Sequence, residues 1–228
     1  MGLSARRILS NARWSEWNPG RLTVYLVGCI FFSIGATFFI VSDLGTDPLD
    51  VFVLGVKEHI SITIGIGQAS VALVCITIWS LWNRCRPVVL PFITFFLCGS
   101  IIDLLLAVEL AEETHIHRVG LMLVGGVLCA YGSTLIIMSA IGIRAMDLLA
   151  ITMVRRWRWP FWASKGSLEA LLLVAGWLLG GPVGVGTLCF LLSVNLLIQP
   201  MIAATERLTS ITNLGLPTRT SASAPEAG

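Results

Sequence analysis

The chain has 228 residues, of which 56% are hydrophobic and only 12% are charged, and its mean hydropathy is +0.87. A soluble domain carries roughly twice this share of charged residues, so the composition excludes a string of soluble domains and indicates a helical membrane protein. The net charge of +2 says little, but basic residues cluster between apolar segments, which makes nucleic-acid binding a poor explanation for them.

Six apolar segments are each near the ~20 residues that a helix needs to cross a bilayer. We predict spans at Leu22–Val41, Ile64–Trp82, Val88–Val108, Val119–Ile141, Phe161–Leu179 and Val183–Ala203. The first follows a basic segment, as in a signal peptide. It is too long for a signal-peptide core and no small-residue cleavage site closes it, so we expect it to be retained.

The two halves of the sequence repeat each other at a constant distance of 97 positions. The segment 33–37 matches 130–134, and Ser42, Gly45 and Asp50 match Ser139, Gly142 and Asp147. Each copy holds three predicted spans, and an odd number places the second copy upside down in the membrane. We therefore predict an all-α polytopic membrane protein of six spans in two inverted three-helix repeats, an architecture typical of transporters.

The predicted organisation has four parts. Residues 1–21 form a basic cytoplasmic N-terminus, 22–110 the first repeat, 119–203 the inverted second repeat and 204–228 a cytoplasmic tail. The tail is rich in Thr, Ser, Pro and Ala, a composition that favours disorder.

The distribution of basic residues predicts the orientation. With the N-terminus in the cytoplasm, every Lys and Arg except Lys57 and Arg118 falls on the cytoplasmic side, as the positive-inside rule requires. Arg144 is counted there, in the segment after the fourth span. Seven tryptophans fall near the same interface: Trp14, Trp17, Trp79, Trp82, Trp157, Trp159 and Trp162. Both termini are predicted to be cytoplasmic.

A break follows the first span of each repeat. In the first repeat Gly45 can end a helix, and Asp47 followed by Pro48 is typical of a helix N-cap with proline at the first helical position. A short helix, re-entrant or interfacial, is expected from Pro48 to about His59. In the second repeat Gly142 repeats the break and Asp147 repeats Asp50.

We expect the two breaks to face each other between the repeats. The helix N-termini carry unpaired N–H groups and partial positive charge, which suit an anionic or polar substrate, while Asp50 and Asp147 bind a proton or a cation. The alternative is that each Asp caps a short helix or pairs with an Arg.

Four further polar residues lie in apolar surroundings. Asp103 falls inside the third span, where a charge usually faces the bundle interior, although solvation at the outer interface is an alternative. Lys165 and Glu169 lie four residues apart and are expected to pair, either at the site or as a surface pair near the cytoplasm. Gln68 is the first-repeat counterpart of Lys165. We predict no metal site and no cofactor.

Three segments carry a resemblance to a known family. The segment 44–51 (LGTDPLDV), the later Gly142, Asp147 and Glu169, and the segment 176–187 (GWLLGGPVGVGT) resemble the bacterial YczE/YyaS/YitT-type integral membrane proteins. The resemblance covers roughly residues 28–199. It implies a multi-span protein of the bacterial cytoplasmic membrane, with transport or export of small molecules as the usual suggestion. Three positions depart from the pattern: Ala145, Lys165 and Asn195 stand where Pro, Arg and Gly are expected.

The leading hypothesis is a small-molecule transporter or exporter with a polar site between the repeats, with proton or cation coupling left open. The alternative is a membrane scaffold or an accessory subunit of another complex. An intramembrane enzyme ranks last, because the sequence holds no catalytic constellation. The expected partners are the lipid bilayer and an unidentified small molecule, and a homo-oligomer remains an alternative to a monomer.

Overall fold

The structure is a computed structural model that describes residues 18–108 and 117–209. Within these two ranges the chain forms eight helices and no strand. The helices are α2 (Pro19–Ser42), α3 (Pro48–Lys57), α4 (Ile64–Asn83), α5 (Leu90–Ala107), α6 (Arg118–Ser139), α7 (Ala145–Trp157), α8 (Phe161–Leu178) and α9 (Val185–Leu208). The all-α prediction is confirmed for this part of the chain.

The six predicted spans correspond to α2, α4, α5, α6, α8 and α9. Their ends agree within three residues, except at the C-terminal end of α9. Five of these helices, α2, α4, α5, α6 and α9, are long and apolar enough to cross a membrane. The 18 residues of α8 include Lys165 and Glu169, which lower its hydropathy, so the sixth span remains a prediction.

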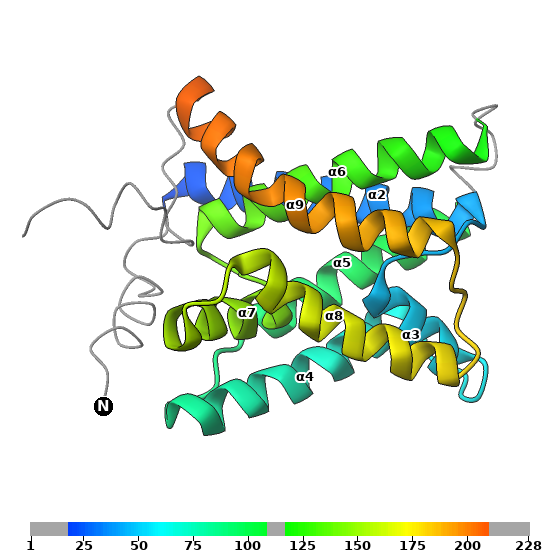
Figure 1. Ribbon diagram of the computed structural model, residues 1–228, viewed down its shortest axis with the longest axis horizontal. Coiled ribbons are helices and arrows are strands. Elements are labelled where there is room, and N and C mark those ends of the chain that lie inside the picture. The colour runs from blue at the N-terminus through cyan, green and yellow to red at the C-terminus, as the bar shows by residue number, and fades with distance from the viewer. Residues whose placement is uncertain (1–17, 109–116, 210–228) are drawn as a thin grey trace, which may run out of the picture.

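The longer helices run roughly along the long axis of the molecule, whereas α3 and α7 lie toward its opposite ends (Figure 1). The first residues of both short helices are buried within the bundle, and the last residues of α7 are exposed. Each short helix therefore begins inside the protein and ends at the surface. The irregular backbone at the start of each short helix is therefore covered by protein.

Helices α2 and α6 cross with their backbones in close contact. A Cβ atom on Gly28 would lie 3.0 Å from the carbonyl oxygen of Gly132, and one on Gly35 would lie 2.7 Å from that of Gly125. Glycine at helix crossings allows such close approach in membrane proteins. The two contacts are reciprocal: Gly125 and Gly132 are the residues 97 positions after Gly28 and Gly35.

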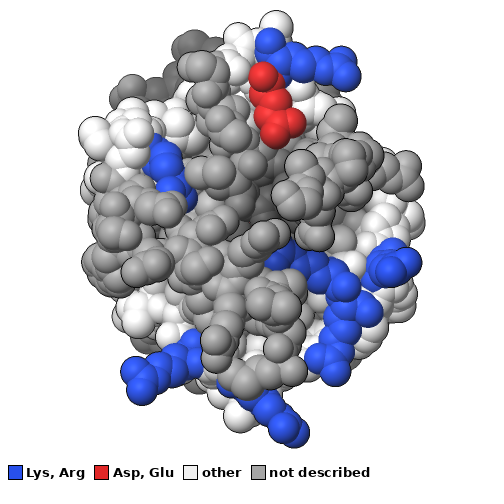
Figure 2. Space-filling view, turned by 90° about the vertical axis from the view of Figure 1, so that its left-hand side faces the viewer, with Lys and Arg blue, Asp and Glu red and all other residues white. Residues whose placement is uncertain are grey.

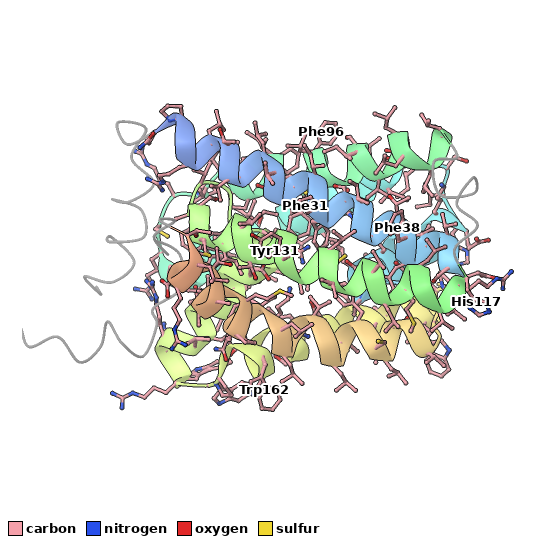
Figure 3. All side chains as sticks on the ribbon, turned by 90° about the horizontal axis from the view of Figure 1, so that it is seen from above. Phe31, Phe38, Phe96, His117, Tyr131 and Trp162 are labelled. Atoms are coloured by element: carbon pink, nitrogen blue, oxygen red, sulfur yellow. The ribbon has the colours of Figure 1, made fainter. Side chains whose placement is uncertain are left out.

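Phe32 and Cys129 lie between these two glycine contacts, and they too are 97 positions apart. The thiol of Cys129 lies 3.6 Å from the carbonyl oxygen of Phe32. Beside them the rings of Phe31 and Tyr131 are in contact, with centroids 5.9 Å apart (Figure 3). The crossing of α2 and α6 thus brings the matching positions of the two halves together.

The two breaks share their first turn but differ in their caps. The residues after α2 and α6, Asp43 and Ala140, both adopt the left-handed conformation, with φ of 54° and 52°. Asp47 caps α3 as predicted, and its side chain accepts a hydrogen bond from the backbone of Asp50. The residue at the matching position of α7 is Arg144, which makes no side-chain cap bond.

The two break glycines differ in backbone conformation. Gly45 has a φ of 102°, a value that glycine adopts without strain. Gly142 is not among the described glycines with a positive φ. The predicted second break exists, but its left-handed turn lies at Ala140 rather than at Gly142.

One end of the molecule is basic. Figure 2, which faces this end, shows several Lys and Arg side chains and few acidic ones among the described atoms. Exposed arginines from the ends of α4, α7 and α9 belong to it: Arg84, Arg86, Arg155, Arg156, Arg158 and Arg207. Trp157, Trp159 and Trp162 are about half exposed, as expected for an interfacial belt.

Two expectations about this end are corrected. Trp79 is buried in the bundle, where its indole N–H donates to the hydroxyl of Thr152, 3.0 Å away. The segment 204–208 is helical rather than disordered, because α9 continues to Leu208. Residues 1–17 and 210–228, which hold most of the predicted N-terminus and tail together with Trp14 and Trp17, lie outside the described residues.

Candidate functional site

A group of polar side chains is buried inside the bundle, and each is at most 3% exposed. Its members come from both repeats and are Asp47, Asp50, Gln68, Arg144, Asp147, Lys165, Glu169 and Asn195. Ionisable groups inside a membrane protein are costly, and those that occur usually mark a substrate or ion pathway. We call these eight residues the central network, with Asp47, Asp50 and Gln68 as its first half-site and the other five as its second.

The first half-site is built around Asp50, on the first turn of α3. The backbone N–H of Asp50 donates to Asp47 Oδ1 at 2.6 Å, and Gln68 Nε2 on α4 donates to Asp50 Oδ1 at 2.7 Å. Asp50 Oδ2 is fully buried and has no hydrogen-bond partner within the described part of the chain. The side-chain partner of Asp50 in this half-site is therefore a neutral amide, and Asp47 Oδ1 is occupied by the backbone of Asp50.

The second half-site is built around Lys165, on the first turns of α8. Its ammonium lies 2.7 Å from Asp147 Oδ1 and 3.0 Å from Glu169 Oε1. Arg144 Nε lies 3.4 Å from Asp147 Oδ2. Asn195 Nδ2 on α9 donates to Glu169 Oε2 at 2.5 Å. The predicted pairing of Lys165 with Glu169 is confirmed, but the pair is buried in the bundle and does not lie at the surface.

The two half-sites share one geometry. In each, a residue of the second long helix donates to the aspartate 18 positions earlier: Gln68 to Asp50 and Lys165 to Asp147, both at 2.7 Å. The half-sites lie close enough for the charges of Arg144, Glu169 and Lys165 to act on Asp47. That the two breaks face each other between the repeats stays a prediction.

Arg144 is the main residue that the sequence reasoning misplaced. It was counted among the cytoplasmic basic residues, whereas its side chain is buried and its guanidinium lies 4.0 Å from the ring centre of Phe32. That stacking and the ion pair with Asp147 offset the cost of burying its charge. A signal existed, since Arg144 lies 97 positions after Asp47. Asn195 was noted only as a departure from a family pattern.

Asp103 does not join the central network. It lies near the end of α5, and its carboxylate accepts hydrogen bonds from the backbone N–H groups of Ile64 and Gly65 at 3.0 and 2.9 Å. These are orphan donors in the first turn of α4, which an acidic group stabilises. The structure therefore places Asp103 in a capping role, and its predicted membership of the site is not supported by these contacts.

Several other buried polar atoms lack a hydrogen-bond partner among residues 18–108 and 117–209. They are Thr46 Oγ1, Ser133 Oγ, Arg144 Nη1, Ser164 Oγ and Asn195 Oδ1, whereas Arg144 Nε and Asp147 Oδ2 lack a hydrogen bond but form an ion pair with each other at 3.4 Å. Buried polar groups in proteins are usually paired, so a group of unpaired ones calls for an explanation such as a ligand or water. In the same ranges no three His, Cys, Asp or Glu side chains are grouped closely enough to hold a metal ion.

The glycine-rich segment 176–187 holds the first break in place. Gly184 approaches the carbonyl oxygen of Leu44 too closely to carry a side chain, and Gly186 N–H donates to that oxygen at 2.7 Å. Gly176 contacts the backbone of Phe52 on α3, where a Cβ atom would lie 2.6 Å away. The second break is held from the other half, since Thr94 on α5 donates to the carbonyl oxygen of Gly142 at 2.8 Å.

Comparison with known proteins identifies relatives of this chain. It is 25% identical over 180 residues to the uncharacterized membrane protein YczE of Bacillus subtilis, covering 78% of this chain and 84% of the relative. It is 26% identical over 191 residues to the uncharacterized protein YyaS of the same organism, covering 80% and 92%. An uncharacterized protein of Haemophilus influenzae is 25% identical over 215 residues, covering 90% and 96%.

No solved structure matches the chain. The resemblance to YczE and YyaS inferred from the motifs is confirmed, and the apolar helices agree with a membrane protein. The matched region of the family model, residues 19–202, includes every residue of the network. The chain therefore belongs to the family of unknown function DUF6198.

Proposed function

We propose that this protein carries a small polar or charged molecule across the bacterial cytoplasmic membrane, through a site between two inverted repeats. The single observation that carries the proposal is the central network, in which six ionisable side chains are buried in an otherwise apolar bundle. A buried ion pair stabilises a protein no better than apolar packing does. The network is therefore better explained by a ligand than by stability.

The arrangement of the helices supports an inverted repeat. Helices α3 and α7 begin 97 positions apart, as do α4 and α8. The reciprocal contacts between α2 and α6, with Phe32 and Cys129 between them, fit a two-fold axis in the membrane plane that passes near this pair. The short helices then begin at the same depth from opposite sides, which is where transporters of this architecture bind their substrates.

A sixth span is part of the proposal. Helix α8 carries Lys165 and Glu169, which make its hydropathy lower than that of the five other long helices, yet both side chains are buried inside the bundle. Residues that face lipid along α8, such as Leu171, Val174 and Leu178, are apolar and exposed. The helix therefore presents hydrocarbon to the bilayer and its charges to the protein interior, as a spanning helix must.

The orientation follows from the basic end of the molecule, which we place in the cytoplasm together with both termini. The opposite end carries Lys57 and Arg118, the latter paired with Asp43 at 3.5 Å. Reporter fusions test this placement. Fusions after Arg86 and after Arg158 should report the cytoplasm and a fusion after Lys57 the outside. Fusions after Arg86 and Arg158 on opposite sides of the membrane would rule out the proposed topology.

Flux in a reconstituted system tests the transport function. Purified protein in proteoliposomes would be screened on a solid-supported membrane with sets of small amines, carboxylic acids, amino acids and sugars. We expect a transport current with one of these classes, and its loss in the Asp50→Asn and Asp147→Asn variants. Asp103→Asn is the matched control, because Asp103 caps a helix outside the network. Currents that survive in both network variants would contradict the proposal. Absence of flux with every class, together with a stably copurifying partner protein, would favour the scaffold.

A further inference from the structure

The two half-sites can be compared position by position, because they belong to matching segments of the two repeats. Each residue of the second half-site has a counterpart 97 positions earlier in the first repeat, and three of these pairs differ in charge. Gln68 stands in place of Lys165, Asp47 in place of Arg144, and Ala72 in place of Glu169. The aspartates Asp50 and Asp147 are conserved between the halves and accept equivalent hydrogen bonds at 2.7 Å.

These differences leave the first half-site short of positive charge. The second half-site combines the two cations Arg144 and Lys165 with the two carboxyl groups of Asp147 and Glu169. The first combines the carboxyl groups of Asp47 and Asp50 with a neutral amide. A buried carboxylate without a cation loses its hydration and gains no ion pair in return.

Two buried and unpartnered atoms belong to this segment of the chain. Asp50 Oδ2 has no hydrogen-bond partner in the described ranges, although the side chain is fully buried. The hydroxyl of Thr46, next to Asp47 in the chain, is also buried and unpartnered there. A carboxylate oxygen and a hydroxyl are both suitable ligands for an ammonium group or an alkali metal ion.

We propose that the first half-site binds a small monovalent cation at Asp50 and Asp47, in the role that the ammonium of Lys165 fills at Asp147. The proposal rests on the proposed function and specifies its ligand. The cation is either the primary ammonium of an organic substrate or an alkali metal ion that drives transport. Both are single positive charges that carboxylate and hydroxyl oxygens recognise, and the experiment below distinguishes them.

Arg144 does not make this cation unnecessary. It interacts electrostatically with Asp47 and Asp50, but its closest carboxylate contact is with Asp147, at 3.4 Å from Nε. The network as a whole contains four carboxyl groups, Asp47, Asp50, Asp147 and Glu169, and two cations. Because one guanidinium is shared among three aspartates, it does not fully compensate the charge of Asp50. An external cation can therefore still bind there.

The Gln68→Lys variant tests the proposal, because it gives the first half-site the ammonium that the second already has. Wild type and variant would be purified in nanodiscs, and thermal unfolding measured at equal ionic strength in sodium, methylammonium or choline chloride. Choline is the control, since it is bulky and has no N–H donor. We expect sodium or methylammonium to raise the melting temperature of the wild type by roughly 5–10 °C at a concentration about 100 times the dissociation constant. Gln68→Lys should be as stable as the wild type in choline and lose this rise.

Each result decides a separate question. A rise with methylammonium alone identifies the ammonium of a substrate, and a rise with sodium identifies a metal ion. No rise with either salt in the wild type, or a rise that persists in Gln68→Lys, would overturn the proposal and leave the carboxyl groups neutralised by protons. If Gln68→Lys does not fold, Asp50→Asn serves instead and should also lose the rise. The experiment measures cation binding and needs no flux. A failed transport assay therefore leaves this inference standing, and a failed binding experiment leaves the proposed transport function standing.

Discussion

The two half-sites of the central network have the same backbone frame and different charges. Asp50 and Asp147 occupy the same position on the first turn of their short helices, and each accepts a hydrogen bond of 2.7 Å from the residue 18 positions later. In the second half-site this donor is Lys165, which is also held by Glu169. In the first half-site the donor is Gln68, which donates a hydrogen bond but carries no charge. The frame is therefore symmetric and the electrostatics are not.

Because their charges differ, the two half-sites are expected to play different roles. In the second half-site, Asp147 meets the two cations Lys165 and Arg144. The first half-site keeps an unpartnered oxygen on Asp50. We therefore expect substitutions in the second half-site to affect stability most, and substitutions in the first to affect ligand binding and flux most.

The largest expected effect is that of Lys165→Met. Removing Lys165 leaves the buried carboxylate of Glu169 without its cation and Asp147 with Arg144 alone. Removing one partner of a buried ion pair costs about 3–5 kcal/mol. The matched change in the first half-site, Gln68→Met, removes a neutral hydrogen bond and should cost about 1–3 kcal/mol. The free energies of unfolding of the two variants in nanodiscs measure the difference. Equal losses would mean that the two half-sites are electrostatically alike.

A smaller loss of stability is expected for Asp147→Asn, and again a lesser one for its counterpart Asp50→Asn. Asp147→Asn removes the shared partner of Arg144 and Lys165, and we expect a loss of about 3 kcal/mol. Asp50→Asn keeps an oxygen that accepts from Gln68 and removes a charge that has no cation of its own, so its stability should stay within about 1 kcal/mol of the wild type. Unfolding in choline chloride is the appropriate measurement. A greater loss in Asp50→Asn would reverse the assignment of the structural half-site.

The symmetric part of the molecule can be tested through its glycine contacts. Gly35→Ala places a Cβ atom 2.7 Å from the backbone of α6, and Gly132→Ala places one 2.5 Å from the backbone of α2. Overpacking of this kind costs about 1–3 kcal/mol, and reciprocal contacts predict similar losses in the two variants. Gly166→Ala is the control, because the nearest atom would lie 3.9 Å away. Melting temperatures that fall in only one of the two variants would argue against the reciprocal crossing.

The smallest effect is expected for Asp103→Asn. The carboxylate caps two N–H groups at the start of α4, and the amide keeps one acceptor, so the loss should be about 1 kcal/mol or less. Transport, once a substrate class is found, should continue at the rate of the wild type. A loss of flux without a loss of stability would indicate that Asp103 is part of the transport site, as the sequence predicts.

The sequence predicted the local features of the site well and its charges less well. The cap at Asp47 and the start of α3 at Pro48 follow from local chemistry, and the structure contains both. Arg144 was interpreted as cytoplasmic because it precedes the arginines at the end of α7 and lies between spans. Counting charges between spans cannot show that a loop turns back into the bundle. The position of Arg144, 97 residues after the capping residue Asp47, is the sequence feature that indicates its place at the start of a short helix.

The sequence by itself determined that the chain is helical and suited to a membrane, and that its halves repeat every 97 residues. These properties depend on hydropathy and on residue identity, which are local or can be aligned directly. Only the tertiary structure decided that Arg144 and Asn195 join the network, that Asp103 caps α4 and that Asp50 keeps an unpartnered oxygen. The physical reason is that burial and ion pairing depend on which helices pack together, and helix packing is a property of the whole bundle.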